Sequence, residues 1–423
     1  MTKINKTNNE KQLLRFTTAG SVDDGKSTLI GRLLHDTGAI LADQYESLKK
    51  ASNKNGNNEL NLALLTDGLK DERQQGITID VAYRYFATEK RKFIIADTPG
   101  HIQYTRNMVT GASTANLALV LTDARKGIIE QTKRHAFIAS LLNIPHLILC
   151  INKMDLVDYS EKVFNKIKDD FSKFSAKLNI KDIQFIPISA LYGDNIIDKS
   201  LKMKWYKGTD LLYILENIHI NSDYNLIDCR FPIQIVITNK TKSANKRYYA
   251  GKIASGIFKA GDNIMHLPSK LTTQISSINF AGKSINEAYP PMSVNIEITD
   301  DIDISRGDMF VREHNQPTRS KNIELIICWF NQNPINIDKK YIIRHTTCTA
   351  MASIQKIRYK IDINTLHRLD NDKTIGMNDF ARISIVTSQA LNFDKYIHNR
   401  AECLCRFCIV FFVSKPLLYR LCV

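Results

Sequence analysis

A glycine-rich segment near the start of the chain has the residue types and spacing of a phosphate-binding loop. Gly20 to Ser27 reads GSVDDGKS, which fits the pattern G-x-x-x-x-G-K-S. It follows the apolar run LLRFTTA and precedes a helical pattern, and this context disfavours a chance glycine turn. The glycines let backbone N–H groups surround phosphates at a helix N-terminus. Lys26 can reach the β- and γ-phosphates of a nucleotide, and the Ser27 hydroxyl can ligate Mg²⁺.

A second motif, Asp97-Thr98-Pro99-Gly100, ends the apolar run RKFIIAD. An Asp at this strand end would face the Mg²⁺ site, and the Gly100 N–H can meet a γ-phosphate. Alone, this tetrapeptide is more often an ordinary turn. Its position at a strand end, downstream of the phosphate-binding loop, favours the nucleotide interpretation.

Other positions near these two motifs could act on the γ-phosphate. Thr78, in the run Gly76-Ile77-Thr78, is placed to close over Mg²⁺ and the γ-phosphate as a switch. His101 directly follows the second motif and could orient the attacking water, although a His at the start of a helix is often only a cap. Val22 and Ile77 could form an apolar gate beside His101; as simple packing residues they would look the same.

Two further strand ends carry residues suited to a guanine base. Asn152 to Asp155 reads NKMD after the run HLILCI, and Ser189 to Leu191 reads SAL after QFIPI. The Asp155 carboxylate can accept hydrogen bonds from guanine N1 and N2, and a site built on such bonds rejects the wrong partner by roughly 10⁴-fold. Asn152 would support the base edge, the Lys153 stem would pack on the ring, and the last motif could place a backbone N–H at guanine O6.

The four motifs, in this order at successive strand ends, predict a site for GTP and Mg²⁺. The candidate catalytic residues are His101, Thr78 and Lys26, and the candidate magnesium ligands are Ser27, Thr78 and Asp97. The candidate GTP contacts are Gly20, Ser21, Val22, Asp23, Asp24, Gly25, Lys26, Ser27, Thr28, Asp97, Thr98, Pro99, Gly100, Asn152, Lys153, Asp155, Ser189, Ala190 and Leu191.

The elements that must position these residues alternate between short apolar runs and helical stretches, from Leu14 to about Ile218. Strands are predicted for the apolar runs LLRFTTA, RKFIIAD, NLALVLTDA, HLILCI and QFIPI. Helices are predicted for segments that begin near Ser27, His101, Glu130 and Ser160. This alternation indicates a doubly wound parallel sheet, on which ligands bind at the carboxyl ends of the strands.

The alternation of strands and helices stops after about Asp223. The sequence then predicts short strands broken by Gly, Pro and Asn, which are FPIQIVI, RYYAGKIASG, DNIMHL, TTQISSINF and SVNIEI. This pattern is typical of a small β-barrel, and a second β-rich stretch begins near Ile323. The sequence therefore predicts an N-terminal α/β P-loop domain over residues 1–220 and two β-barrel domains over residues 225–315 and 320–423.

Composition narrows the functional classes. The net charge of +15 is spread along the chain as Lys, with many Asn and Ile residues, which indicates a coding bias and does not favour a nucleic-acid partner. The polar first residues lack a signal peptide, and no apolar run approaches the roughly 20 residues that span a bilayer. We expect a cytoplasmic protein that does not bind membranes.

The order GSVDDGKS, GITI, DTPGH and NKMD resembles the translational GTPases of the elongation factor Tu type, whose β-domains follow in the same way. Several stretches are more similar to a related family, the large GTPase subunit (subunit 1) of bacterial ATP sulfurylase, also called sulfate adenylyltransferase. They are GSVDDGKSTLIGRLLHDTG, LALLTDGLKDERQQGITIDVAYRYFATEKRKFIIADTPGH, QYTRNMVTGAS, INKMDLVDYSE and DIDISRGD. Elongation factors usually carry His in place of Asp24 and Thr in place of Ser27. The similarity extends from Leu13 to about Arg400.

This resemblance implies a function and a partner. In the family, a small catalytic subunit transfers the adenylyl group of ATP to sulfate and forms adenosine 5′-phosphosulfate and pyrophosphate, the first step of assimilatory sulfate reduction. The GTPase subunit couples GTP hydrolysis to this uphill step, in a heterodimer or larger assembly. The chain would thus be a GTPase and coupling subunit of a nucleotidyltransferase. The alternative is an elongation-factor-like GTPase that delivers aminoacyl-tRNA; the basic charge mildly favours it, whereas Asp24 and the run around Thr78 disfavour it.

The chain departs from the family pattern at three places. Ile102 stands where a Glu usually follows DTPGH, and TNKTKSANKRYYAG replaces a segment that usually carries Arg-Pro and Phe-Arg-Gly. From Ala401 the chain reads AECLCRFCIVFFVSKPLLYRLCV, which holds half of the eight cysteines. We interpret this tail as translated out of frame or degenerate, and expect the last barrel to be incomplete, with unpaired edges that lower stability.

Overall fold

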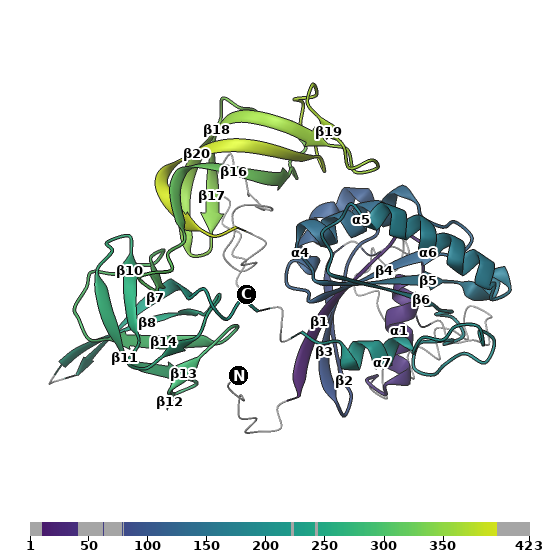
Figure 1. The fold of residues 1–423 in the computed structure, drawn as a ribbon, viewed down its shortest axis with the longest axis horizontal. Coiled ribbons are helices and arrows are strands. Elements are labelled where there is room, and N and C mark those ends of the chain that lie inside the picture. Colours follow the sequence, from purple (N-terminus) through teal and green to yellow (C-terminus); the bar gives the residue numbers. More distant parts are fainter. Residues whose placement is uncertain are drawn as a thin grey trace. The chain divides into compact units, whose positions relative to one another are not determined.

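The computed structural model describes residues 11–40, 62, 78, 80–220, 224–241 and 244–395. They belong to two compact units: the first runs to Ile220 and includes residues 363–366, and the second comprises the remainder (Figure 1). The first unit combines helices with a sheet, and the described part of the second is built from strands. The finer division at residues 225–315 and 320–423 stays a prediction.

A six-stranded sheet forms the centre of the first unit. Its strands are β1 (Gln12–Ala19), β2 (Ala82–Ala87), β3 (Arg91–Asp97), β4 (Leu117–Asp123), β5 (His146–Asn152) and β6 (Asp182–Pro187). They lie in the order β2-β3-β1-β4-β5-β6, and all but β2 are parallel. The five strands predicted from apolar runs are confirmed. The antiparallel edge strand β2 was not predicted, because it exposes Tyr83 and Tyr85 and so lacks a continuous apolar run.

Helices cover both faces of this sheet. They are α1 (Lys26–Asp36), α4 (Thr105–Ala112), α5 (Glu130–Leu141), α6 (Glu161–Ser175) and α7 (Leu211–Asn217). Apolar side chains of α1 and α7 share one core with the strands, and α4, α5 and α6 lie on the other face (Figure 1). Ser160 and Asp210 cap α6 and α7 by accepting hydrogen bonds from backbone N–H groups. The helix expected near His101 begins at Thr105, after a 3₁₀ turn over Ile102–Tyr104.

The second unit begins with a closed barrel. Its strands are β7 (Arg230–Thr241), β8 (Ala244–Lys252), β10 (Asn263–Leu267), β11 (Thr272–Phe280), β14 (Ser293–Ile298) and β15 (Met309–Val311). The short strand β12 (Lys283–Ile285) pairs with β11, and β9 (Phe258–Lys259) and β13 (Glu287–Ala288) form a separate two-stranded sheet. The order β10-β15-β7-β8-β14-β11 closes on itself because β10 also pairs with β11. Phe231, Phe258 and Phe310 fill the interior. The predicted strands and the first barrel are confirmed.

A second β-domain follows in the same unit. Its strands are β16 (Thr318–Cys328), β17 (Lys340–His345), β18 (Cys348–Ile361), β19 (Arg368–Leu369) and β20 (Phe380–Phe393). They pair antiparallel in the order β16-β20-β18-β17, with β19 beside β18, around a core that includes Ile327 and Trp329. The predicted fold class, an α/β domain followed by β-rich domains, is confirmed. The tail from Ala401, with the expectation of an incomplete barrel, lies outside the described residues.

Candidate nucleotide-binding site

The phosphate-binding loop connects β1 to α1 and is held by its own side chains. Asp24 is buried, and its Oδ2 atom accepts a hydrogen bond of 2.7 Å from the Ser21 N–H. Gly25 has a φ of 89°, a left-handed backbone that favours glycine. A Cβ atom at Gly25 would lie 2.3 Å from the side-chain amide nitrogen of Asn152. Helix α1 has no side-chain cap among the described residues, so its first N–H groups fit an anion.

Lys26 lies buried between this loop and the second motif. Its Nζ atom donates to the carbonyl oxygens of Gly20 at 2.9 Å and Ser21 at 2.8 Å. A Cβ atom at Gly100 would overlap the backbone carbonyl oxygen of Gly20, so only glycine allows the two segments to approach this closely. Burial lowers the pKa of Lys26, and the carboxylates of Asp97 and Asp24 oppose that shift.

The second motif is anchored to the strand that precedes the loop. Asp97 ends β3 and lies opposite Thr18 of β1, whose hydroxyl donates to Asp97 Oδ1 at 3.1 Å. The Thr98 hydroxyl donates to the Thr18 carbonyl oxygen, and all three side chains are buried. Parallel neighbouring strands thus bring Asp97 and the phosphate-binding loop to the same edge of the sheet.

Asn152 joins three of the four motifs. Its Nδ2 atom donates to the Asp24 carbonyl oxygen at 2.8 Å, and its Oδ1 atom accepts from the Ala190 N–H at 2.9 Å. The Ser189 hydroxyl donates to Asp155 Oδ1 at 2.6 Å. Both guanine motifs and the phosphate-binding loop therefore meet, as their order in the sequence predicted, and Asn152 supports the loops on either side of it.

The predicted site residues differ in their exposure. The buried ones are Gly20, Asp24, Lys26, Asp97, Thr98, Pro99, Gly100, Asn152, Ser189 and Ala190. The half-buried ones are Ser21, Val22, Gly25, Ser27, Thr28, Thr78, Lys153 and Asp155, and the exposed ones are Asp23, His101 and Leu191. Gly76 and Ile77, with the apolar gate proposed for Ile77, lie outside the described residues.

His101 takes the capping role that the sequence had left open. The side chain is exposed, and Nδ1 accepts a hydrogen bond of 3.3 Å from the Gln103 N–H at the start of the 3₁₀ turn. Its ring also lies 6.0 Å from the ring of Tyr104. The imidazole Nε2 atom takes no part in this cap.

The structure adds side chains that the sequence motifs do not include. Thr18 bonds to Asp97, and Asp123 at the end of β4 lies between Arg125 and Lys153. Asp123 ends a predicted apolar strand as Asp97 does, and that position was an available signal. His135 on α5 is buried as well; burial lowers its pKa to about 3, with further lowering from Lys26 and Arg134. This imidazole stays neutral beside the lysine.

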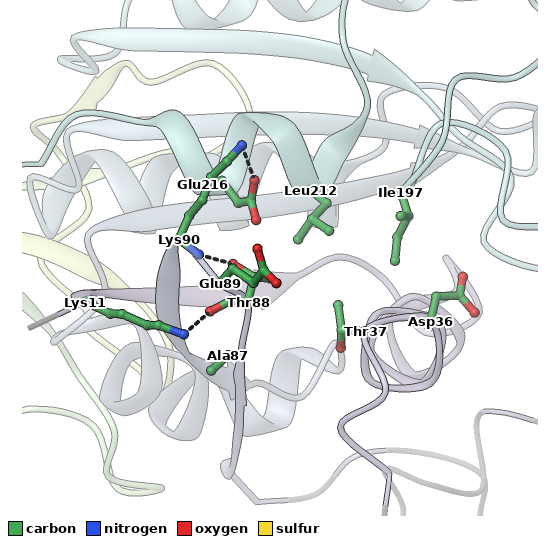
Figure 2. Close-up of a pocket in the computed structure, with 10 residues that line it drawn as sticks. All are labelled: Lys11, Asp36, Thr37, Ala87, Thr88, Glu89, Lys90, Ile197, Leu212 and Glu216. Atoms are coloured by element: carbon green, nitrogen blue, oxygen red, sulfur yellow. Dashed lines mark hydrogen bonds and ion pairs between the residues drawn. The ribbon is translucent and has the colours of Figure 1, made fainter. Parts of the chain in front are cut away.

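A pocket elsewhere on the first unit is separate from these motifs. It measures about 600 Å³ and is lined by Lys11, Asp36, Thr37, Ala87, Thr88, Glu89, Lys90, Ile197, Leu212 and Glu216 (Figure 2). Lys90 pairs with Glu216 at 3.0 Å, and Lys11 donates to the Thr88 carbonyl oxygen at 2.8 Å. None of the predicted nucleotide contacts lines it, so the strand-end site stays the candidate.

Two family models match the chain. The elongation factor Tu GTP binding domain matches residues 11–233, and the GTP-eEF1A C-terminal domain-like family matches residues 322–410. Among solved structures, the GTPase-like domain of Ski7 from S. cerevisiae covers 92% of this chain and 93% of its own, with a TM-score of 0.51 and 21% identity. That likeness concerns the fold alone. In the described part of the chain, no helix is long and apolar enough to cross a membrane.

Curated proteins match nearly the whole chain. The chain is 48% identical over 402 residues to sulfate adenylyltransferase subunit 1 of Bacteroides thetaiotaomicron, which covers 93% of this chain and 82% of that protein. The same protein of Aliarcobacter butzleri is 49% identical over 398 residues, 93% of this chain and 84% of that protein. The bifunctional enzyme CysN/CysC of Mycobacterium tuberculosis is 51% identical over 389 residues; the chain spans 63% of its length.

Proposed function

Because this chain belongs to the family of sulfate adenylyltransferase subunit 1, we propose that it is the GTPase subunit of a sulfate adenylyltransferase. The chain would bind GTP and couple its hydrolysis to the formation of adenosine 5′-phosphosulfate and pyrophosphate from ATP and sulfate. A small catalytic subunit would carry out that adenylyl transfer. The resemblance that the sequence suggested is confirmed, and the relatives favour this function over delivery of aminoacyl-tRNA.

The convergence of the four motifs is the observation that carries the GTP part of the proposal. Asn152 bonds to the backbone at Asp24 and at Ala190, so the phosphate and base sides of the site are held in fixed relation. The Ser189 hydroxyl donates to the Asp155 carboxylate, the group that would accept hydrogen bonds from guanine. Buried polar groups that bond one another in this way define one geometry, which suits recognition of one base.

The residues present also fit Mg²⁺. Ser27, Asp97 and Thr78 are the oxygen donors that would hold it, and Asp97 is already oriented by Thr18. Oxygen donors with few protein carboxylates are typical of Mg²⁺ bound together with phosphates. The ion would neutralise charge that develops on the phosphates. Lys26 would contact the phosphates, and His101 would orient the attacking water.

Coupling to the partner needs only a difference in affinity between two states of this subunit. Formation of the phosphosulfate anhydride is uphill, so GTP hydrolysis must bias it. A subunit whose GTP and GDP states bind the partner's intermediates differently shifts the equilibrium by that differential affinity. This requirement separates a coupling subunit from a GTPase that hydrolyses GTP without consequence for the partner.

A reconstituted assay tests the proposal. The chain is mixed with a small sulfate adenylyltransferase subunit, ATP and sulfate, and pyrophosphate is measured with GTP, with GDP and with a non-hydrolysable GTP analogue. We expect sustained synthesis only with GTP and only when both subunits are present. Synthesis that does not depend on GTP would refute the coupling. If tRNA is retained on the chain in the presence of GTP and no nucleotidyltransferase partner co-purifies, the elongation-factor alternative is supported.

A further inference from the structure

A buried carboxylate lies beside the guanine motif. Asp123 is the last residue of β4 and is the register partner of Asn152 at the end of β5. Its side chain is fully buried, and the Lys153 Nζ atom lies 3.1 Å from its Oδ2 atom. The neighbouring strand therefore places a negative charge directly against the lysine of the guanine motif.

Arg125 also holds this carboxylate. Its Nη2 atom donates to Asp123 Oδ2 at 2.6 Å, and its Nε atom donates to Oδ1 at 3.1 Å. The Arg125 backbone N–H donates to the same Oδ1 atom at 2.9 Å. Burial alone would raise the pKa of Asp123, but the bonds from Arg125 and Lys153 outweigh it and hold that pKa below its usual range. The carboxylate is thus ionised and fixed in orientation.

The turn that carries Arg125 is tied to the guanine motif through the backbone. The N–H groups of Lys126 and Gly127 both donate to the Asp123 carbonyl oxygen at 3.0 Å. The Ala124 N–H donates to the Asn152 carbonyl oxygen at 2.9 Å. These backbone hydrogen bonds, together with the strand pairing of Asp123 and Asn152, join the end of β4 to the start of the guanine motif.

Lys153 itself has an unusual backbone. Its φ of 63° and ψ of 38° lie in the left-handed region, which non-glycine residues adopt only where surrounding contacts enforce it. The backbone sets the direction of its side chain, and Asp123 fixes the far end of that chain. The apolar stem between these two anchors has little freedom, which suits a surface against which a flat ring packs.

We propose that Asp123 and Arg125 are positioning residues for the guanine nucleotide: Asp123 holds the Lys153 side chain in place along the base pocket, and Arg125 orients the Asp123 carboxylate. The proposal rests on the proposed function, because it assumes that the pocket takes a guanine nucleotide. Neither residue touches the base. Their effect is exerted through Lys153, and base selection stays with Asp155.

A double-mutant cycle between Asp123 and Lys153 tests this. Release of GDP is measured for the wild type, for Asp123→Asn, for Lys153→Met, which keeps the apolar stem, and for the double variant. We expect each single variant to release GDP about tenfold faster. If Asp123 acts through Lys153, the double variant should match Lys153→Met, because the partner is already gone. Asp123→Asn should also keep the wild-type preference for GDP over xanthosine diphosphate.

Controls separate positioning from stability. Asp169→Asn makes the same change on the exposed face of α6 and should leave GDP release unchanged. Arg125→Gln, at a half-exposed side chain, gives a second cycle with Lys153→Met if Asp123→Asn does not fold. The positioning role would be overturned if the fold-changes of the two single variants in GDP release multiply in the double variant, or if Asp123→Asn releases GDP at the wild-type rate. Either outcome would leave the proposal of GTP binding intact. A wild-type chain that binds neither GDP nor GTP would overturn the proposed function and this inference together.

Discussion

At the residue scale, Asn152 shows why the guanine motif needs an amide at its first position. Its nitrogen donates to the Asp24 carbonyl oxygen, and its oxygen accepts from the Ala190 N–H. An aspartate would offer no donor, and a leucine would offer neither group. The side chain is 2% exposed, so any group left without a partner would be desolvated. Asn152 thus connects the phosphate-binding loop to the loop that carries Ala190.

Asp155 reads the base in our proposal, and its exchange for asparagine should change which base is bound. Asp155→Asn keeps an oxygen that can accept the hydrogen bond from Ser189, so the loop should stay in place. The amide cannot accept two hydrogen bonds from guanine N1 and N2, but it can donate to the additional carbonyl of xanthine. We expect GDP affinity to fall roughly 100-fold or more and affinity for xanthosine diphosphate to rise. Titration with both nucleotides measures this, and unchanged GDP affinity would refute the assignment.

His101 can be tested against its own capping role. His101→Ala removes both the imidazole and the cap, whereas His101→Ser restores an oxygen that can accept the Gln103 N–H. If His101 orients water, both variants should slow GTP hydrolysis by about 100-fold or more and leave GTP binding unchanged. Single-turnover hydrolysis and a binding titration report the two quantities. Recovery of wild-type hydrolysis in His101→Ser would assign the residue to the 3₁₀ turn alone.

At the element scale, the burial of each strand or helix explains whether the sequence predicted it. Strands β1, β3, β4, β5 and β6 are continuous apolar runs because helices cover both faces of the sheet. Strand β2 is an edge strand with exposed tyrosines, and helix α7 has only seven residues, so neither gives a strong periodic signal.

The four motifs were predictable because each is a local string that follows a strand. The contact between Asp123 and Lys153 was not, because it depends on β4 and β5 being neighbours in the sheet. The capping contact of His101 depends on the backbone of the following turn. Contacts between residues that lie far apart along the chain can be predicted only when the order of the strands in the sheet is known.

The contact between β17 and β20 predicts a pH dependence of stability. His345 is buried, its Nε2 atom lies 2.8 Å from the Asn392 carbonyl oxygen, and burial lowers its pKa to about 4 from an ordinary 6.5. The unfolded chain therefore binds more protons between these values, and the free energy of unfolding should decrease as the pH falls from 6.5 to 4. At pH 5 the loss is about 2 kcal/mol for this group.

His345→Gln can donate the same hydrogen bond but does not titrate in this range, so its stability should change less between pH 7 and pH 5. The chain has two tryptophans, and in a Trp205→Phe background the fluorescence of buried Trp329 reports this β-domain in urea. The matched control is His314→Gln, at an exposed histidine. If the variant and the parent lose equal stability on acidification, His345 is not the group responsible.

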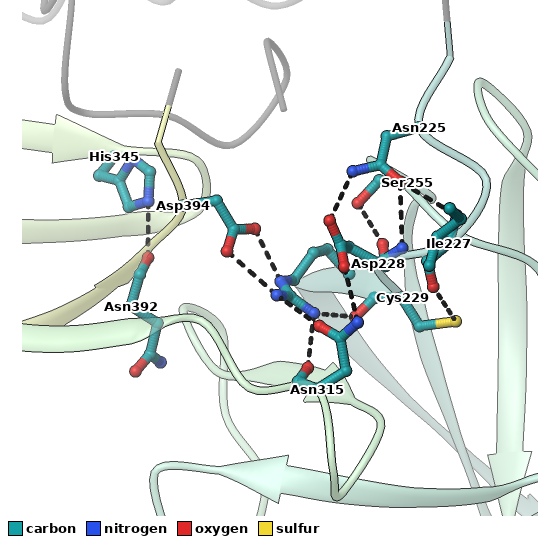
Figure 3. A network of polar contacts seen from close by, with 10 residues as sticks. Asn225, Ile227, Asp228, Cys229, Ser255, Asn315, His345, Asn392 and Asp394 are labelled. Atoms are coloured by element: carbon teal, nitrogen blue, oxygen red, sulfur yellow. Dashed lines mark hydrogen bonds and ion pairs between the residues drawn. The ribbon is translucent and has the colours of Figure 1, made fainter. Parts of the chain in front are cut away.

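At the scale of the whole molecule, a buried polar network connects the two β-domains of the second unit (Figure 3). Arg230 of β7 donates to both carboxylate oxygens of Asp394, at 2.8 and 3.0 Å, and also to the backbone and side chain of Asn315. Asn315 donates in turn to Asp228 at 2.6 Å. The Arg230 side chain is 2% exposed and Asp394 14%, so water screens this pair weakly.

This network should make the stability of one β-domain depend on a residue of the other. Arg230→Met leaves the Asp394 carboxylate without its guanidinium, and removal of one partner from a buried ion pair costs about 3–5 kcal/mol. In the Trp205→Phe background, we expect the urea midpoint reported by Trp329 to fall, although Arg230 belongs to β7 and Trp329 to the other β-domain. The control is Asp301→Asn, which breaks the exposed pair of Arg247 and Asp301 and should have little effect because solvent screens that pair. An unchanged Trp329 transition in Arg230→Met would mean that the two β-domains unfold independently.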